Sequence, residues 1–553
     1  MSVTGALVLE GRSKWRAPAR DGETLVDPPI GGLADTIAAN RKLAWPMDDR
    51  LEGISARELR ALARRELLEA AWNHSLRYRD VHLDRHSTGP LILSGHQPEL
   101  VHLGVWFKHF VLHEAARRVG GIGIHLSIDN DTAKRTSIMV PTGSLNHPGL
   151  TTLAYDRRAT GIPYEERKIE DRAAWSSFGH RVERAIEGLV DHPMIREYWP
   201  RVLRQSTERV GEAIATARHQ TEEQFGLQTL ETPLSSVCRG QAFSWFVAMM
   251  LADFESLWSA YNRALREYRV VHRLKSSQHP APDLQQIDEW WEIPLWIWTA
   301  DQPIRRRCYV RRVGNDVGLT DRHGLECRIP QGKEIASSAG ASALHELTCR
   351  GIRLRPRALT TTLYARWIAA DLFIHGIGGA AYDEVTHQIA RAWWGVPAPT
   401  LMVATATFRL PVPIPDVSSE DLRRIDQRLR ELEFHPELFL SADQADADRW
   451  VRQKRDWIAQ DLPRGQRRER HRRIVEANRK LQPLVASLRG RLLEERERIE
   501  QMLRHRQVLA SREYAFCLFP ERYAEKLAQA AQIEPSRTVE PMCEAAGERP
   551  PCR

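Results

Sequence analysis

Residues 91–108 read LILSGHQPELVHLGVWFK, and this stretch decides the fold class that the sequence predicts. Its apolar beginning follows Gly89-Pro90 and is typical of a short buried strand. The segment 103–118 predicts a helix that Gly120-Gly121 end, and IGIHLSID at 122–129 predicts a second strand. A strand, a helix and a strand in this order indicate a βαβ unit of a parallel sheet.

A second run of the same pattern lies in the C-terminal half of the chain. LTTTLYARWIAA at 359–370 predicts a helix, and DLFIHGIGG at 371–379 predicts a strand that runs into a glycine-rich loop. YDEVTHQIARAWWG at 382–395 then predicts a helix, and TLMVATATFRL at 400–410 predicts a strand. The sequence therefore predicts an α/β protein with a Rossmann-like core that is split by a large, mostly helical insertion.

The C-terminal part predicts a long helical hairpin or coiled coil, because apolar residues recur there at helical spacing. This stripe consists of Leu481, Leu484, Leu488, Leu492, Ile499 and Leu503. Pro483 is expected to kink the helix or to begin a new one. The predicted division is an N-terminal loop-rich and helical segment (1–88), the first half of the core (89–144), the insertion (145–345) with a small antiparallel sheet (285–330), the second half of the core (346–415), a coiled-coil arm (416–510), a return segment that docks on the body (511–532) and a disordered tail (533–553).

The composition favours a soluble cytoplasmic protein of 553 residues. No apolar run approaches the roughly 18–20 residues that a membrane span needs. The seven cysteines show no C-x-x-C spacing, which favours reduced thiols over a disulfide framework or a metal site. The net charge of +8 comes largely from residues 464–480, where no aromatic residues are interleaved. A solvated helix face therefore explains the charge better than nucleic-acid binding does.

Three polar clusters follow predicted core strands at the end where ligands of open α/β sheets bind. The first comprises Gly95, His96, Gln97 and His102; the second comprises Asp129, Asn130 and Asp131; the third comprises His375, Gly376, Gly378, Gly379 and Tyr382. If both halves of the core share one sheet, these clusters converge on a single crevice. That convergence is the reason to expect a functional site.

Each cluster suits a particular chemistry. Backbone N–H groups of HGIGG can approach phosphate oxygens at the start of a helix, and Lys108 can meet an anion. His96 and His102 are candidate acids, bases or charge stabilisers. Asp129 and Asp131 are candidates for holding a ribose, an amine or a magnesium ion. A plain glycine turn and an Asx-turn or helix cap at the aspartates remain open as alternatives, and no metal site is predicted.

The chain resembles the BshC family, the cysteine-adding ligases of bacillithiol biosynthesis, over most of its length. LILSGHQPELVHLG stands where that family has a strand followed by Gly-Gln-Gln, and LSIDND stands where it has an acidic stretch. RPRALTTTLYARWIAADLFIHGIGGAAYDEV is similar to the family's Arg-Pro segment, strand and Gly-x-Gly loop with its tyrosine. LQPLVASLRGRLLEERERIEQML and EYAFCLFPERY are similar to its C-terminal helix and return segment.

The resemblance implies a ligase or transferase that joins an amino acid, or another amine or thiol, to an acceptor. It also implies a nucleotide-like or other anionic small-molecule ligand, with ATP and ADP as candidates. Separately, the sequence leaves open a homodimer that pairs through the coiled-coil arm. His96 replaces a glutamine of the family, and the acidic run lacks one carboxylate and a histidine. Two alternatives stay open: a class I nucleotidyltransferase-like enzyme with a degenerate H-x-G-H motif at HLGV, 102–105, and a non-catalytic interaction protein that uses its basic arm.

Overall fold

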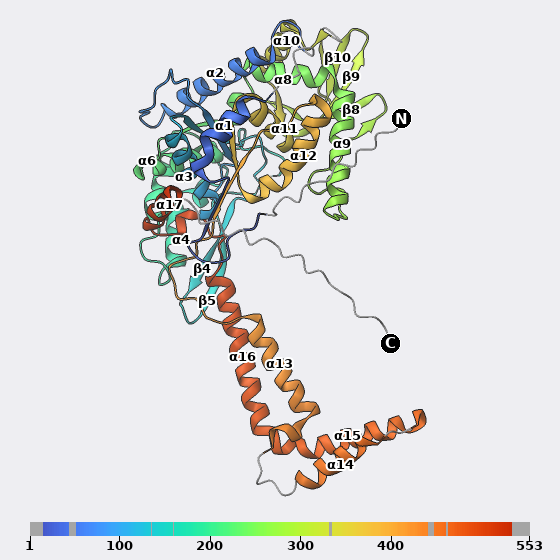
Figure 1. Ribbon diagram of the computed structural model, residues 1–553. Helices are drawn as coiled ribbons and strands as arrows, with labels where there is room; N and C mark the ends of the chain where they lie inside the picture. Colours follow the sequence, from blue (N-terminus) through green and yellow to red (C-terminus); the bar gives the residue numbers. More distant parts are fainter. Residues whose placement is uncertain are drawn as a thin grey trace.

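A computed structural model shows an α/β body from which a long helical arm projects (Figure 1). The structure describes residues 15–43, 51–133, 135–158, 160–330, 334–440, 447–460 and 463–533. Almost all of the predicted tail, 534–553, lies outside the described residues. Within the described ranges, no helix is long and apolar enough to cross a membrane.

The body is organised around a six-stranded, mostly parallel sheet with the order β1-β14-β13-β2-β3-β6. Its strands are β1 (Thr24–Asp27), β2 (Leu91–His96), β3 (Ile122–Ser127), β6 (Leu230–Pro233), β13 (Leu372–His375) and β14 (Met402–Ala406). All neighbours pair in parallel except β1, which runs antiparallel to β14 at one edge. The two distant segments of the chain share this sheet because β13 pairs with β2, so the predicted α/β class is confirmed.

Apolar side chains alternate between the two faces of the sheet, as the pleat of a strand requires. Leu91 and Leu93 contribute to one hydrophobic core, whereas Ile92 contributes to the other. The first face is covered by α2 (Ala56–Ser75) and α12 (Ile377–Trp394), on which α8 (Gln241–Ala252) and α9 (Phe254–Val271) pack in turn. The second face is covered by α3 (Leu103–Arg118), on which α17 (Arg522–Gln532) packs. The sheet is therefore buried on both faces.

The predicted insertion contributes a strand to this sheet. β6, which lies within the predicted insertion 145–345, pairs with β3 at the edge of the parallel sheet. β4 (Ser137–Gly143) comes just before this region and pairs with β5 (Pro148–Ala154) at its start. α4 (Arg172–Ile186), α5 (Ile195–Leu203) and α6 (Val210–Gln224) precede β6, and α7 (Leu234–Val237) follows it. Four residues of LETP carry too little periodicity to be distinguished from a loop by sequence.

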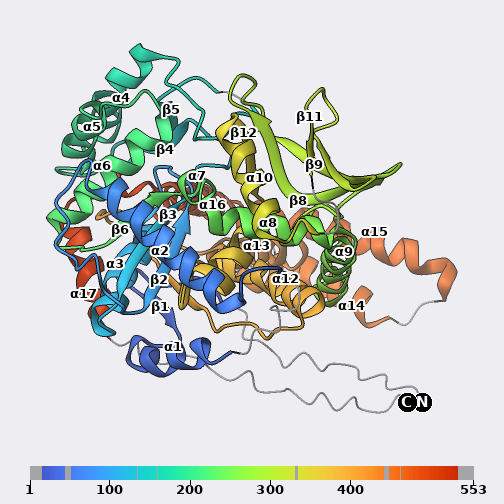
Figure 2. The same cartoon turned by 90° about the horizontal axis from the view of Figure 1, so that it is seen from above.

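A second, antiparallel sheet lies on the other side of the body from α4, α5 and α6 (Figure 2). Its order is β11-β10-β9-β8-β12, and β7 pairs with β8. The strands are β7 (Gln286–Ile287), β8 (Trp290–Thr299), β9 (Arg306–Val313), β10 (Asp316–Thr320), β11 (Glu326–Ile329) and β12 (Ile352–Pro356). The chain reaches β12 through α10 (Ser338–Cys349) and returns to the parallel sheet through α11 (Ala358–Leu363) and the π-helix η4 (Tyr364–Ala369).

The arm consists of α13 (Ser419–Phe434) packed along α16 (Ala486–Leu509), with α14 (Ala447–Ala459) and α15 (Arg467–Leu481) at its far end (Figure 1). Ile425, Leu492 and Ile499 are buried between α13 and α16. The 3-10 turn η7 (Gln482–Val485) contains Pro483 and joins α15 to α16. Beyond the arm, Phe516 packs on Trp106 of α3 with ring centroids 4.6 Å apart.

Candidate functional site

The strand order contains one point where the chain's direction of travel across the sheet reverses. From β2 the chain moves to β3 and β6 on one side, whereas β13 and β14 lie on the other. Ile374 of β13 is in register with Ser94 of β2, so the residues that follow these two strands lie side by side. Ligands of open α/β sheets bind at such a switch point, outside the carboxyl ends of the strands. Two of the three predicted clusters therefore meet here.

Lys108 lies on α3, on the second face of the sheet, and its side chain extends to the end of β2. Its side chain is buried, and Nζ donates a hydrogen bond of 3.0 Å to the carbonyl oxygen of Gly95. A Cβ atom added to Gly376 would lie 3.8 Å from Cδ of Lys108, which places the lysine between the ends of β2 and β13. Burial, helped by the charge of Arg218, lowers the pKa of Lys108 from 10.5 to about 8. The group is thus mainly a buried cation at pH 7.

The HGIGG segment runs directly from the end of β13 into the first turn of α12 and is not a separate loop. The helix begins at Ile377, five residues earlier than the sequence suggests, with Gly376 as its N-cap. No side chain caps this end, and the first backbone N–H groups of a helix have no intrahelical acceptor. Gly378 is exposed, and a Cβ atom there would have nothing within 4 Å. The positive end of the helix dipole is consequently open to an anion.

His375, at the end of β13, is held by a carboxylate that sequence reasoning missed. Its Nε2 lies 3.3 Å from Oδ2 of Asp383, which also forms a buried ion pair with Arg366 of η4. Burial opposes ionisation of Asp383, but Arg366 and His375 outweigh it and hold the pKa of this carboxyl well below its usual range. Burial lowers the pKa of His375, and Asp383 works against this shift. The i,i+4 spacing of Asp383 and His387 was the available sequence signal.

The first and second clusters are joined by Asp131. Gln97 Nε2 donates to Asp131 Oδ2 at 3.0 Å, and Arg305 Nη1 donates to Oδ1 at 2.8 Å. Burial raises the pKa of Asp131, but Arg305 and the bond from Gln97 leave it lowered. The guanidinium of Arg305 lies 4.3 Å from the ring centroid of Trp296, so the antiparallel sheet also supports this group. Asp131 is therefore a fixed carboxylate beside the end of β2.

His96 is half-buried and lies next to this pair. Its Nδ1 is 3.0 Å from the carbonyl oxygen of Gln97, which requires the proton on Nδ1 and leaves Nε2 as an acceptor. Desolvation, followed by the charge of Lys108, lowers the pKa of His96 to about 3. The imidazole is neutral at pH 7, which suits a hydrogen-bonding role better than the proton-carrying role expected from sequence.

Asp129 and Asn130 anchor the fold instead of facing the switch point. Asp129 accepts from the Ser235 backbone N–H at 2.9 Å and from the Ser235 hydroxyl at 2.5 Å. Burial, together with the nearby Glu165, raises the pKa of Asp129 to about 7. Asn130 Nδ2 donates to the carbonyl oxygen of Pro356 at 2.7 Å. These bonds tie β3 to α7 and to β12.

His102 and Tyr382 also have partners elsewhere. His102 is the N-cap of α3, where its Nδ1 accepts from the Gly104 N–H at 3.1 Å and its Nε2 lies 3.8 Å from a carboxylate oxygen of Glu513. Tyr382 packs edge-on against His279, with ring centroids 5.3 Å apart. The helix-cap interpretation is therefore the one that describes His102 in this structure.

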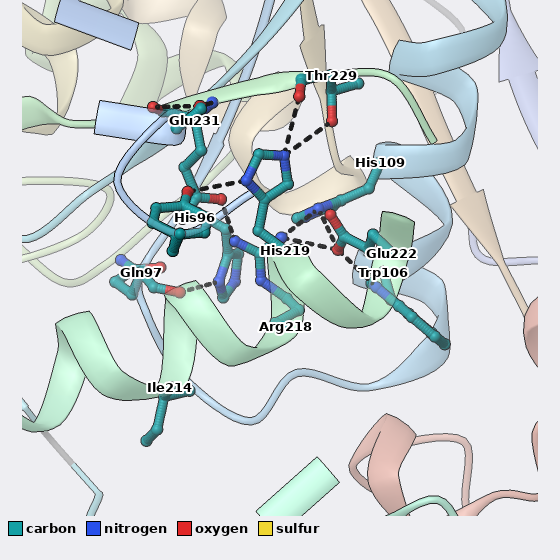
Figure 3. Close-up of polar contacts among 12 residues, drawn as sticks. His96, Gln97, Trp106, His109, Ile214, Arg218, His219, Glu222, Thr229 and Glu231 are labelled. Carbon is teal, nitrogen blue, oxygen red and sulfur yellow. Dashed lines mark hydrogen bonds and ion pairs between the residues drawn. The ribbon is translucent and has the colours of Figure 1, made fainter. Parts of the chain in front are cut away.

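A buried ionic network lies close to His96 (Figure 3). Arg218 of α6 donates to Glu222 at 2.7 Å, contacts His109 Nδ1 at 2.7 Å and pairs with Glu231 of β6. Trp106 Nε1 also donates to Glu222, at 2.7 Å. Glu222 and Glu231 thus share Arg218 as their cationic partner. The network fixes α6 against α3 and β6 next to the site. In the described part of the chain, no group of three or more His, Cys, Asp or Glu side chains is arranged to hold a metal ion.

No family model matches the chain, and no curated protein matches it either.

Proposed function

We propose that the chain is a Rossmann-like enzyme of the BshC-like ligase type, which binds an anionic small molecule at the β2–β13 switch point. It would join an amine- or thiol-bearing compound, such as an amino acid, to an acceptor, with ATP or ADP as the candidate nucleotide. The observation that carries this proposal is the juxtaposition of the buried Lys108 ammonium with the uncapped first turn of α12.

The anion would lie between Lys108 and α12. An ammonium has three hydrogens, and the Gly95 carbonyl takes one of them. The backbone N–H groups of the first turn add donors at the positive end of the helix dipole. The oxygens of a phosphate or carboxylate can accept hydrogen bonds from both sets of donors. Such charge-assisted hydrogen bonds are shorter and stronger than those between neutral groups. Gly378 leaves room for the ligand to approach the backbone closely.

The neighbouring groups would orient the reacting partner. Asp131, fixed by Gln97 and Arg305, is suited to accept a hydrogen bond from an amine or hydroxyl. His96 offers a neutral Nε2 acceptor at the same edge. His375, whose Nε2 lies 3.3 Å from Oδ2 of Asp383, is an imidazole just before the start of α12 and is the candidate proton carrier. These roles give the ligase proposal a binding group, an orienting carboxylate and a proton carrier.

The two alternatives have less support from the contacts. In the nucleotidyltransferase-like interpretation, His102 would face a nucleotide, yet its Nδ1 accepts from the backbone of its own helix. The interaction-protein interpretation has the arm in its favour, since Phe434 and Leu438 near its far end are 50% and 71% exposed. It gives no reason for burying a lysine at the switch point, which costs free energy in a protein with no ligand there.

Isothermal titration of the full chain with ATP, ADP and cysteine tests the proposal. We expect saturable binding of at least one of them, about tenfold or more weaker in Lys108→Met, because a charge-assisted hydrogen bond is removed. Lys168→Met is the matched control, since that side chain is 72% exposed and lies outside the site. Failure of all three compounds to bind, or equal binding by Lys108→Met and wild type, would refute the proposal.

A further inference from the structure

A polar cavity of about 590 Å³ lies away from the switch point, between the end of α2, α5 and α6. It is lined by Arg77, Tyr78, Arg201, Arg204, Gln205, Ser206, Thr207, Glu212, Thr216, Gln220, Glu223 and Gln224. Positions 212, 216, 220 and 223 are three or four residues apart and form one face of α6. Arg218 and Glu222 point from the opposite face into the buried network (Figure 3). The cavity is thus separate from the site described above.

Two arginines of this cavity differ from the arginines of the core. In the core, Arg218, Arg355 and Arg366 each pair with a carboxylate. In contrast, Arg201 Nη1 donates to neutral acceptors, Thr221 Oγ1 at 2.9 Å and Gln224 Oε1 at 3.2 Å. Among the described residues, no carboxylate lies within ion-pair distance of Arg201 or Arg204.

Their positions make these two guanidiniums a pair. Arg201 is in the last turn of α5, and Arg204 is its C-cap, one turn further along. Burial, followed by the positive charge of Arg204, lowers the pKa of Arg201, while Glu197 and Glu521 act against this shift. Two like charges held near one another, with no carboxylate of the described residues within ion-pair distance of either, repel each other, and an anion that bridges them lowers this cost. Guanidinium forks match the oxygens of phosphate in geometry as well as in charge.

The other side chains that line the cavity are suited to bind the hydroxyl groups of a ligand. Gln205 Nε2 donates to Gln220 Oε1 at 2.9 Å, and Thr207 Oγ1 donates to Glu212 Oε2 at 2.9 Å. Amides and hydroxyls both donate and accept, whereas carboxylates accept only. The lining has no large apolar surface against which an apolar ligand could be buried. A hydroxylated ligand can exchange its water contacts for these groups without loss.

We propose that this cavity binds a sugar phosphate, with the phosphate on Arg201 and Arg204 and the sugar hydroxyls on the amide, hydroxyl and carboxylate groups of α6 and residues 205–207. The volume is within the range of small-molecule sites, roughly 300–1,000 Å³. The proposal is independent of the ligase hypothesis, because it uses none of the residues at the switch point.

Isothermal titration of the full chain with glucose 6-phosphate, glucose and inorganic phosphate tests this assignment. We expect saturable binding of glucose 6-phosphate, weaker binding of phosphate and none of glucose. Arg204→Gln, an exposed position that has no hydrogen-bond or ion-pair partner for its side chain among the described residues, is expected to weaken glucose 6-phosphate binding about tenfold. Arg201→Gln combined with Arg204→Gln is expected to abolish it.

Matched controls separate this site from others. Arg263→Gln with Arg266→Gln removes two exposed arginines at the same spacing on α9 and should leave binding unchanged, as should Lys108→Met. Thermal melts establish that the Arg204 variant is folded. Absence of saturable glucose 6-phosphate binding, no gain over inorganic phosphate, or wild-type affinity in the folded Arg204→Gln variant would overturn the proposal.

Discussion

Replacing Lys108 by methionine is expected to stabilise the fold at pH 7 while weakening anion binding about tenfold or more. Burial lowers the pKa of Lys108 from 10.5 to about 8. At about 1.36 kcal/mol per pKa unit, this shift corresponds to a destabilisation of about 3 kcal/mol at pH 7. Methionine fills a similar volume without the charge, but it leaves the Gly95 carbonyl without its donor, which costs about 1–3 kcal/mol. The net expectation is a gain of up to about 2 kcal/mol in the free energy of unfolding.

The pH dependence gives the sharper test. Below pH 8 the lysine is protonated in the folded and unfolded states, so the full penalty is present. Between pH 8 and 10.5 the folded state releases its proton first, and the penalty fades as the pH rises. The advantage of Lys108→Met over wild type should therefore shrink by about 2.5 kcal/mol from pH 7 to pH 10.

Urea unfolding followed by circular dichroism and tryptophan fluorescence at both pH values measures this difference. Lys168→Met, at a position where the side chain is 72% exposed, should match wild type at both. The reasoning fails if Lys108→Met is less stable than wild type by the same amount at pH 7 and pH 10.

Two further pairs of substitutions test the packing and the ion pair beside the site. Gly379→Ala would place Cβ 2.6 Å from His375 Nδ1 and should lower stability by about 1–3 kcal/mol in thermal melts, whereas Gly378→Ala, with nothing within 4 Å, should be tolerated. Equal melting temperatures for the two variants would contradict the packing described here. Arg366→Met leaves the buried Asp383 carboxylate without its cation and should cost about 3–5 kcal/mol in chemical denaturation. Arg366→Lys, which keeps the charge, should lose less, and similar losses for both would argue against the ion pair.

The sheet could be predicted because its two halves carry local signals. Each half has a short apolar run that ends in glycine and polar residues, followed by a helix of clear periodicity. Parallel pairing then places Gly95 beside His375 and Gly376, as the strand-end rule requires. The sequence predicts the start of α12 too late, because Gly378 and Gly379 are poor helix formers. The close approach of His375 to Gly379, which a Cβ atom would prevent, is a tertiary contact that the sequence does not show.

The roles of the buried polar residues could not be predicted, because their partners are far away in sequence. Asp129 looks like a free carboxylate at a strand end, yet its partner Ser235 is 106 residues away. Glu231 lies on β6, whose four residues have no visible period, and its pairing with Arg218 depends on the tertiary packing of α6. A single sequence contains no signal for such pairings, so Asp129 could not be distinguished from Asp131.

The central claim is that an anion binds between Lys108 and the first turn of α12. A crystal structure of the protein with ADP at saturating concentration tests it most directly. The account predicts phosphate oxygens within hydrogen-bonding distance of Lys108 Nζ and of the Gly378 backbone N–H. Absence of ADP from this point, or ADP found only in the cavity between α5 and α6, would contradict it.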